Sequence, residues 1–315
     1  VRDGIAGIGG RMEYPLKYGY MNAGITPGGE RVFAFYPHQD RFYYPQQDLV
    51  YFPDSVSFED IVLYPSVETA YTIVLDAAPL PGERVLVIGQ GMIGLLVSEI
   101  LTGCWGPALH TAALEPDPYR RRLGSELGIP AEDPSGLGRN ELREMVRELF
   151  GGYLPDAVIH VSGSGEGLQQ GVDASDFETR IIEASWHGNR PVRLDLGGEF
   201  HRNRIRIISS QVSTLPTKLG PRWNRSRRTA EAVQWVRRIE PSKYITDRFP
   251  LTEAQAAYRT IFGSGSADEA PGGRVLQAVL VPDSEYAGGA DGFGSPHDSG
   301  GTRDTGGTHP PERST

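Results

Sequence analysis

The feature of this sequence that most limits its fold is a glycine-rich turn between an apolar strand and a helix. Val85 to Ile88 are apolar, the turn follows at once, and a helical pattern begins at Ile93. In this setting the first glycine permits a tight turn, the second lets a diphosphate approach the backbone, and the third allows close packing of helix on strand. The N–H groups at the helix start favour an anion. The sequence therefore predicts that a dinucleotide is bound by Gly89, Gly91, Met92, Ile93 and Gly94. The alternative is a tight turn that binds no ligand.

An acidic residue stands where such a turn needs a partner. Glu115 lies 21 residues beyond Gly94, at the end of the next apolar run. A carboxylate there accepts hydrogen bonds from the adenosine ribose and repels the extra phosphate of NADP. Arg120 and Arg121 follow closely and could pair with that phosphate. We expect NAD as the cofactor, with NADP possible; the alternative is that Glu115 is a solvated strand end.

Apolar runs alternate with helical stretches through the middle of the chain. The runs lie at 85–88, 108–114, 156–161 and 180–184, and helical patterns start near 93, 118 and 168. Strands that are apolar throughout and alternate with helices indicate a parallel sheet covered on both faces. We therefore expect an α/β fold with a doubly wound parallel sheet.

A second glycine cluster follows the third of these strands, at residues 162–167. Loops at the carboxyl ends of strands line the ligand crevice of a doubly wound sheet. Ser162 and Gly163 are therefore expected to face the nicotinamide half of the cofactor. An ordinary helix-entry loop is the alternative.

The flanking segments have different patterns. Short β-rich runs at 32–36 and 41–44 indicate a piece of a small β-domain, and a helix at 226–239 and a closing strand at 274–281 follow the α/β region. Several arginines between 222 and 238 are expected on a solvated helix face, with contact to a carboxylated substrate or a pyrophosphate as the alternative. Residues 283–315 are rich in glycine and proline and offer almost nothing to bury, which predicts a disordered tail.

Composition excludes several function classes. The 315 residues suffice for two domains, and the net charge of −9 gives no positive field for nucleic acid or an anionic membrane. No apolar stretch is long enough to cross a bilayer. The single cysteine, Cys104, rules out an internal disulfide and any zinc site built from several thiolates. We expect a cytoplasmic protein that acts on a small molecule.

The order of these elements resembles the medium-chain dehydrogenase/reductase superfamily, the alcohol-dehydrogenase-like fold. The closer likeness is to the bacteriochlorophyllide a dehydrogenase branch, which oxidises a hydroxyethyl side chain of a tetrapyrrole to an acetyl group. The resemblance runs from Tyr14 to about Phe262, and its segments are 14–20, 32–40, 67–70, 183–188, 198–201 and 209–212.

The resemblance implies four regions. Residues 1–72 would form a truncated N-terminal part of a GroES-like catalytic domain, and 73–222 a Rossmann dinucleotide-binding domain. Residues 223–282 would return to the catalytic domain, and 283–315 would be the tail. A homodimer is common in this superfamily, and the alternating segment 201–207 would suit an edge or dimer strand.

The departures from the superfamily pattern concern zinc. Zinc-dependent members supply a Cys, then a His and Glu in a Gly-His-Glu run, and another ligand just before the dinucleotide domain. Here the run reads Gly19-Tyr20-Met21, the later position is Tyr64, and the segment that would hold the Cys is absent. Neither tyrosine is a good zinc ligand. We therefore expect no catalytic zinc.

Without zinc, a hydrogen-bonding acid or base must act on the substrate oxygen. His38 is the first candidate for proton relay, Tyr20 could donate to the substrate oxygen, and Lys17 could pair with it. By resemblance, Glu68 approaches the nicotinamide and could orient its carboxamide or act as base. The alternatives are that His38 is a structural histidine, that Tyr20 fills space as an aromatic residue, that Lys17 is solvated and that Glu68 belongs to a buried ion pair.

Two aromatic residues complete the expected cofactor site, since Trp186 and His187 end a strand near the nicotinamide by resemblance. The resulting hypothesis is a dehydrogenase without catalytic zinc, moving a hydride between NAD(H) and a secondary alcohol or ketone. The substrate could be bulky, such as a hydroxyethyl-tetrapyrrole. The alternatives are a zinc-free quinone or enoyl reductase, and a dinucleotide-binding module without turnover.

Overall fold

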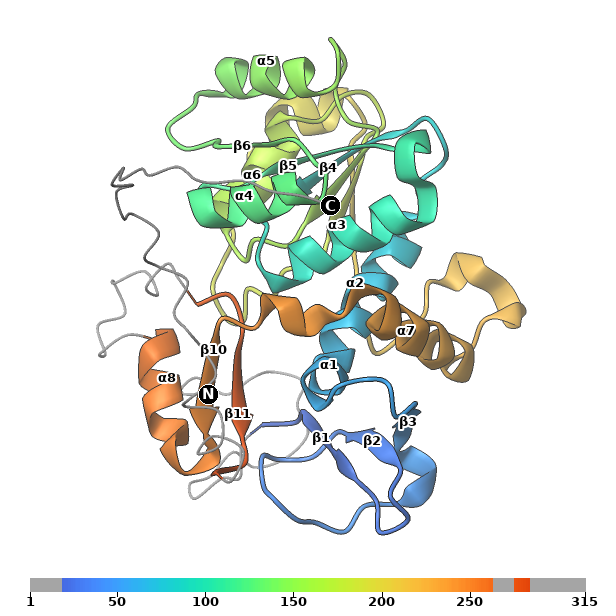
Figure 1. Ribbon diagram of the computed structural model, residues 1–315. Helices are drawn as coiled ribbons and strands as arrows, with labels where there is room; N and C mark the ends of the chain where they lie inside the picture. The colour runs from blue at the N-terminus through green and yellow to red at the C-terminus, as the bar shows by residue number, and fades with distance from the viewer. Residues whose placement is uncertain (1–18, 263–274, 284–315) are drawn as a thin grey trace, which may run out of the picture.

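A computed structural model describes residues 19–262 and 275–283 of the chain (Figure 1). The α/β sheet and its helices form the upper part of the molecule in this view, and a small β-sheet forms the lower part. Helices α2 (Tyr64–Ala77) and α7 (Arg225–Ile239) lie between them. Residues 284–315 of the predicted tail and Lys17 lie outside the described residues.

The upper part is a six-stranded sheet in the order β6-β5-β4-β7-β8-β9, with every neighbouring pair parallel. The predicted doubly wound α/β fold is confirmed. The strand order reverses between β4 and β7, which is where such sheets open a ligand crevice. The strands are β4 (Arg84–Ile88), β5 (His110–Leu114), β6 (Ala131–Glu132), β7 (Ala157–His160), β8 (Arg180–Glu183) and β9 (Arg206–Ser209).

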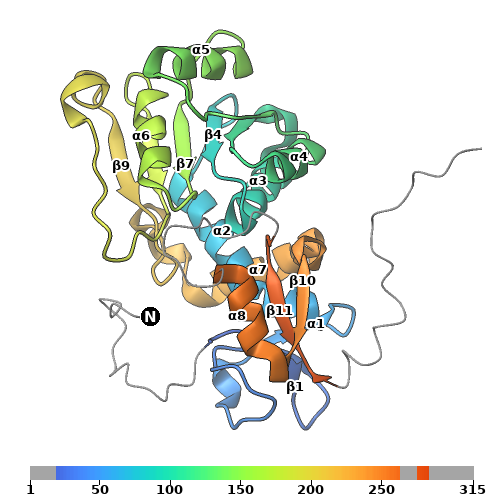
Figure 2. The same cartoon turned by 90° about the vertical axis from the view of Figure 1, so that its left-hand side faces the viewer.

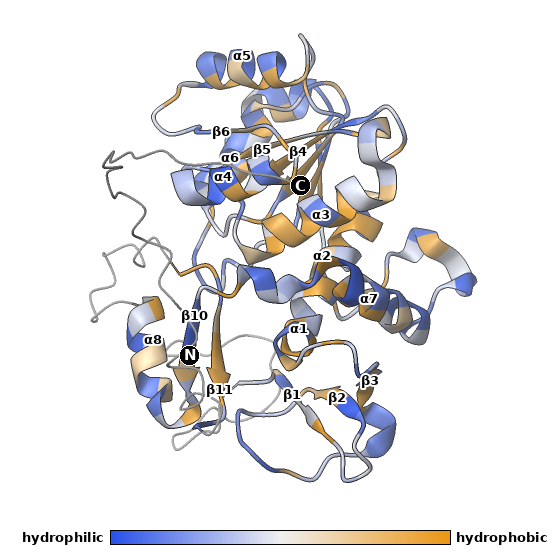
Figure 3. Ribbon diagram, in the orientation of Figure 1, coloured by the Kyte–Doolittle hydropathy of each residue, from blue (hydrophilic) through white to orange (hydrophobic). Residues whose placement is uncertain are grey.

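Helices cover both faces of this sheet. Figure 2 shows α3 and α4 on one side and α6 on the other, and α5 shares its buried core residues with α6. Alternate residues of β4 serve the two faces, because Val85 and Val87 join the core beneath α3 while Leu86 and Ile88 join the core beneath α5 and α6. The helices are α3 (Met92–Trp105), α4 (Pro118–Glu126), α5 (Arg139–Leu149) and α6 (Gly165–Asp173). Figure 3 shows the hydrophobic residues concentrated in the strands and in α2 and α3.

The lower part contains an antiparallel three-stranded sheet in the order β1-β2-β3. The predicted small β-domain is therefore confirmed, but the strand expected at 41–44 is wrong. No strand forms there; instead the Phe42 ring stacks on Tyr36 at 4.3 Å between centroids. The elements are β1 (Asn22–Ile25), β2 (Arg31–Ala34), β3 (Val50–Phe52) and the short helix α1 (Phe58–Val62).

The chain crosses to the upper part through α2, which is continuous from Tyr64 to Ala77, so the expected domain boundary at 72/73 falls inside a helix. After the sheet, α7 begins at the predicted place, where the Asn224 side chain accepts a hydrogen bond from the Arg227 N–H at 2.9 Å. The return segment ends with the parallel pair β10 and β11 beside α8 (Figure 2). These elements are β10 (Asp247–Pro250), α8 (Ala254–Phe262) and β11 (Ala278–Val281).

None of the helices in the described ranges combines the length and the apolar composition that crossing a lipid bilayer requires.

Candidate active site

The glycine turn joins β4 to α3 as predicted, and its three glycines meet different surroundings. Gly89 has a φ of +100°, and a Cβ there would lie 2.8 Å from the Ser162 Cα. A Cβ on Gly94 would overlap the Gly89 carbonyl oxygen. Both positions therefore require glycine for backbone reasons alone.

Gly91 differs because the space above it is open. Its φ of −70° suits any residue, and the nearest atom to an added Cβ would be Arg120 Nη1 at 4.0 Å. The fold itself does not need a glycine here, whereas close approach of a diphosphate does. The first-turn N–H groups of α3, from Met92 to Gly94, have no partner within the helix and favour an anion at this place.

Glu115 braces the glycine turn. Its side chain is 4% exposed, one carboxylate oxygen accepts from the Gln90 N–H at 2.7 Å, and the other accepts from the Asp117 N–H at 3.0 Å. A carboxylate has about four acceptor sites, so two remain for a ribose diol. Because Glu115 is buried, it is not the solvated strand end that was the alternative.

The two arginines after Glu115 have different partners. Arg121 donates to the Glu115 carbonyl at 2.7 Å and pairs with Asp133 at 3.2 Å. Arg120 instead places its guanidinium beside Gly91. Arg120 is therefore the residue of this pair that is positioned to meet a phosphate.

The second glycine cluster lies directly across from this turn, because Ser162 packs against Gly89. Gly163 has a φ of +71° and donates its N–H to Ser185 Oγ at 3.0 Å, which ties the β7 loop to the β8 loop. Ser164 is the N-cap of α6. The sequence thus placed Ser162 and Gly163 at the carboxyl edge of the sheet correctly, beside the reversal of strand order.

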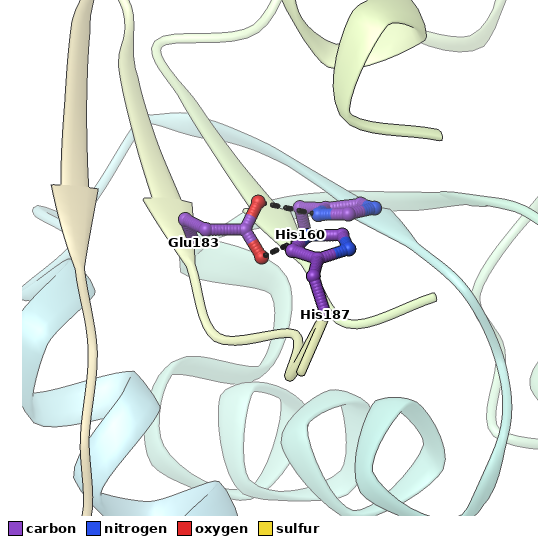
Figure 4. Close-up of side chains that lie close together, drawn as sticks. All are labelled: His160, Glu183 and His187. Atoms are coloured by element: carbon purple, nitrogen blue, oxygen red, sulfur yellow. Dashed lines mark hydrogen bonds and ion pairs between the residues drawn. The ribbon is translucent and has the colours of Figure 1, made fainter. Parts of the chain in front are cut away.

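Three side chains that the glycine pattern did not indicate as a group gather at this edge (Figure 4). His160 is fully buried, and its Nδ1 lies 2.6 Å from Glu183 Oε2. His187 Nε2 lies 3.5 Å from Glu183 Oε1, without hydrogen-bond geometry, and is buried with no hydrogen-bond partner among the described residues. Donor atoms of all three residues lie within 4.8 Å of one another, so in the described part of the chain this group could hold a metal ion.

Sequence reasoning missed His160 and Glu183, although a signal for them was present. Each is the last residue of its strand and follows two buried apolar residues, and the two are paired in the parallel register of β7 and β8. Polar residues at the carboxyl ends of neighbouring parallel strands meet at the crevice. Trp186, expected at the cofactor, is 64% exposed beside this group.

Two of the catalytic residues expected in the β-domain, His38 and Tyr20, lie near each other. The His38 ring packs directly over Gly19, next to Tyr20, whose own side chain is exposed. Burial lowers the pKa of His38, which keeps its imidazole neutral near pH 7, the form that accepts a proton. Roles for His38 and Tyr20 stay predictions.

The structure does not support the role of base that was expected for Glu68. It is buried and accepts from Arg228 Nη2 at 2.9 Å and from the Tyr64 hydroxyl at 2.7 Å. A carboxylate that neutralises a buried guanidinium is not free to act as a base, so the geometry favours the buried ion pair. Arg228 is likewise not on the solvated helix face expected for it.

The position of the superfamily's later zinc ligand also argues against a metal there. Tyr64 is 1% exposed, and burial and the adjacent Glu68 carboxylate both raise the pKa of its hydroxyl, which therefore stays protonated. A protonated phenol that donates to a carboxylate does not fit a zinc ion.

Sequence and structure comparisons agree on the class of protein. No family model matches the chain. Sorbitol dehydrogenase of Halalkalibacterium halodurans is 24% identical over 204 residues, which are 64% of this chain and 52% of that protein. The chain thus spans about half the length of the curated relatives it matches.

Solved structures share the fold. The 2R,3R-butanediol dehydrogenase of Bacillus subtilis superposes with a TM-score of 0.62 at 16% identity, covering 81% of this chain and 74% of that one. A short chain alcohol dehydrogenase of E. coli CFT073, in complex with NADH, gives a TM-score of 0.59 at 18% identity, covering 76% and 74%. The chain therefore has the fold of these dehydrogenases.

Proposed function

We propose that this protein is a nicotinamide-dependent dehydrogenase that transfers a hydride between NAD(H) and a secondary alcohol or its ketone. The observation that carries the proposal is the open space above Gly91, at the start of α3 and beside the reversal of strand order. Gly89 and Gly94 are required by the backbone itself, whereas a glycine at position 91 is explained by the close approach of a ligand.

The residues present fit the cofactor. The first turn of α3 would hold the diphosphate, with Arg120 beside it, and Glu115 would accept from the adenosine ribose. The β7 and β8 loops, with Ser162, Gly163, Trp186 and His187, would line the nicotinamide half. When bound, the nicotinamide takes up or gives back the hydride.

The proposal assigns no role to zinc, because Tyr64 does not fit as a ligand and Tyr20 is a poor one. The relatives include a sorbitol dehydrogenase and a threonine dehydrogenase, which supports a hydroxyl-bearing substrate. Exposed aromatic rings of Tyr20 and Phe35, 6.4 Å apart and nearly parallel, would suit a bulky planar substrate such as a tetrapyrrole.

Cofactor choice gives a direct test. We expect NADH to bind about tenfold or more tightly than NADPH, because the buried Glu115 carboxylate repels a 2′-phosphate. Fluorescence titration of both reduced cofactors measures the ratio. Removing the carboxylate charge in Glu115→Gln should bring the two affinities closer together. Tighter binding of NADPH would contradict the assignment, and absence of binding by either cofactor would remove the proposed function.

A second test concerns the β-domain. If His38 and Tyr20 act on the substrate oxygen, His38→Ala and Tyr20→Phe lower kcat about 100-fold or more while NADH affinity stays near that of the wild type. Steady-state kinetics on a panel of secondary alcohols and ketones, with NADH titrations alongside, make the measurement. Unchanged turnover in both variants means that the proton is handled elsewhere.

A further inference from the structure

A chain of short hydrogen bonds starts at the carboxyl edge of the parallel sheet and runs into it. Ser162 is exposed and packs against Gly89, and its Oγ lies 2.7 Å from His160 Nε2. The His160 ring has no exposed surface, and its Nδ1 lies 2.6 Å from Glu183 Oε2. One surface hydroxyl is thereby joined to a buried imidazole and a carboxylate.

The positions of the protons follow from the acceptor properties of the three groups. A carboxylate accepts hydrogen bonds and does not donate them, so Nδ1 of His160 carries the proton on the Glu183 side. Nε2 of the neutral imidazole is then an acceptor, and the Ser162 hydroxyl donates to it. A hydroxyl, a base and an orienting carboxylate in this order form an arrangement that activates the hydroxyl.

Backbone contacts hold this arrangement in place. The Ser164 N–H donates to Ser162 Oγ at 3.2 Å, which fixes the side on which that oxygen accepts. The Ser185 N–H donates to Glu183 Oε1 at 2.8 Å, so each carboxylate oxygen has its own donor. The strand register that pairs His160 with Glu183 sets their separation.

We propose that Ser162, His160 and Glu183 form a proton relay that takes the hydroxyl proton of the substrate. The proposal rests on the function proposed above and moves the acid–base chemistry from the β-domain to the dinucleotide-binding domain. Ser162 meets the substrate oxygen, while His160 and Glu183 act through it.

The O–H bond of the alcohol breaks and its proton goes to Ser162 Oγ as the Ser162 proton moves to His160 Nε2. Glu183 stabilises the imidazolium that forms. The carbon loses a hydride to the oxidised nicotinamide dinucleotide and becomes a carbonyl, and ketone reduction runs the same transfers in reverse.

A metal centre on the same residues fits the geometry less well. Two ligands of a tetrahedral zinc at about 2.0–2.1 Å stand roughly 3.3 Å apart. The 2.6 Å between His160 Nδ1 and Glu183 Oε2 is shorter and is the length of a charge-assisted hydrogen bond. The remaining member, His187, places Nε2 at 3.5 Å from Glu183 Oε1, and that nitrogen has no hydrogen-bond partner among the described residues.

The first experiment needs no substrate and no cofactor. Proton NMR of the full chain should show a strongly deshielded Nδ1–H resonance from His160. It should be absent in His160→Gln and Glu183→Gln and retained in His110→Gln, which changes an exposed histidine at the start of β5. Absence of the resonance in the wild type, or its survival in His160→Gln, overturns the relay.

The second experiment measures turnover. Ser162→Ala and His160→Gln should each lower kcat, measured at saturating NADH, about 100-fold or more. Imidazole added to His160→Ala should restore part of the rate, since a merely structural loss would not respond to a soluble base. Ser162 is exposed, so Ser162→Ala tests the relay even if the His160 variants fail to fold.

Other outcomes separate the two proposals. Wild-type kcat in Ser162→Ala, or loss of turnover in His38→Ala but not in His160→Gln, overturns the relay and leaves the dehydrogenase. One zinc ion per wild-type chain that is lost in His160→Gln also overturns it, because Nδ1 would then carry metal. Binding of NADH without turnover on any alcohol or ketone overturns the proposed function and the relay together, because no substrate proton is then transferred.

Discussion

Gly91→Ala is expected to abolish cofactor binding without weakening the fold. An added Cβ meets only Arg120 Nη1 at 4.0 Å, and the backbone conformation suits alanine, so thermal unfolding should occur within about 1 °C of the wild type. The same Cβ occupies the space where a diphosphate must approach the backbone. NADH affinity should fall about 100-fold or more, as measured by fluorescence titration.

Two other glycines supply matched controls for this result. Gly94→Ala places its Cβ on the Gly89 carbonyl oxygen, so α3 must shift, and the protein should lose about 1–3 kcal/mol of stability together with cofactor binding. Gly24→Ala, in β1, has no atom within 4 Å and should change neither quantity. If Gly91→Ala binds NADH like the wild type, no diphosphate lies over this turn and the proposed function is wrong.

The second prediction concerns the stability that the buried ion pair of Glu68 on α2 and Arg228 on α7 provides. Glu68→Gln is expected to destabilise the protein by about 3–5 kcal/mol, because it leaves the buried guanidinium of Arg228 without a counter-charge. The pair is 2.9 Å apart with side chains 7% and 6% exposed, so water cannot replace the lost partner. Urea unfolding of the wild type and the variant measures the difference.

A double variant and an exposed ion pair test whether the loss of stability arises from an unpaired buried charge. Glu68→Gln combined with Arg228→Met should be less destabilised than Glu68→Gln alone, because no unpaired charge stays buried. Arg204→Ala breaks the exposed pair with Glu178, whose side chains are 72% and 46% exposed, and should cost under about 1 kcal/mol. Equal stability of Glu68→Gln and the wild type would show that Glu68 is not needed as a structural anion.

Local backbone requirements made much of the region around the glycine turn predictable. The strand, the glycine turn and the helix that follow one another from Arg84 to Trp105 lie where the sequence placed them, because each glycine answers a steric need of its own short segment. Helix α5 was not expected, and its Leu142 and Val146 are nevertheless buried against α6 and the sheet. In that case tertiary packing supplied a partner for an apolar face.

Side-chain roles that depend on distant partners were not predictable in the same way. Glu68 and Arg228 are 160 positions apart, and no local pattern reveals that a charged residue on α7 meets one on α2. The same limit applies to His160 and Glu183, since only the register of β7 and β8 joins them.

The sequence by itself determined the parallel α/β sheet, its glycine turn and the position of Glu115 at the end of the next strand, because strand hydrophobicity, glycine stereochemistry and spacing act over short stretches of chain. Only the tertiary structure decided that Glu68 is a buried counter-ion and that Ser162, His160 and Glu183 share one line of hydrogen bonds. Those arrangements arise from helix packing and strand register, which bring together residues that the chain keeps apart.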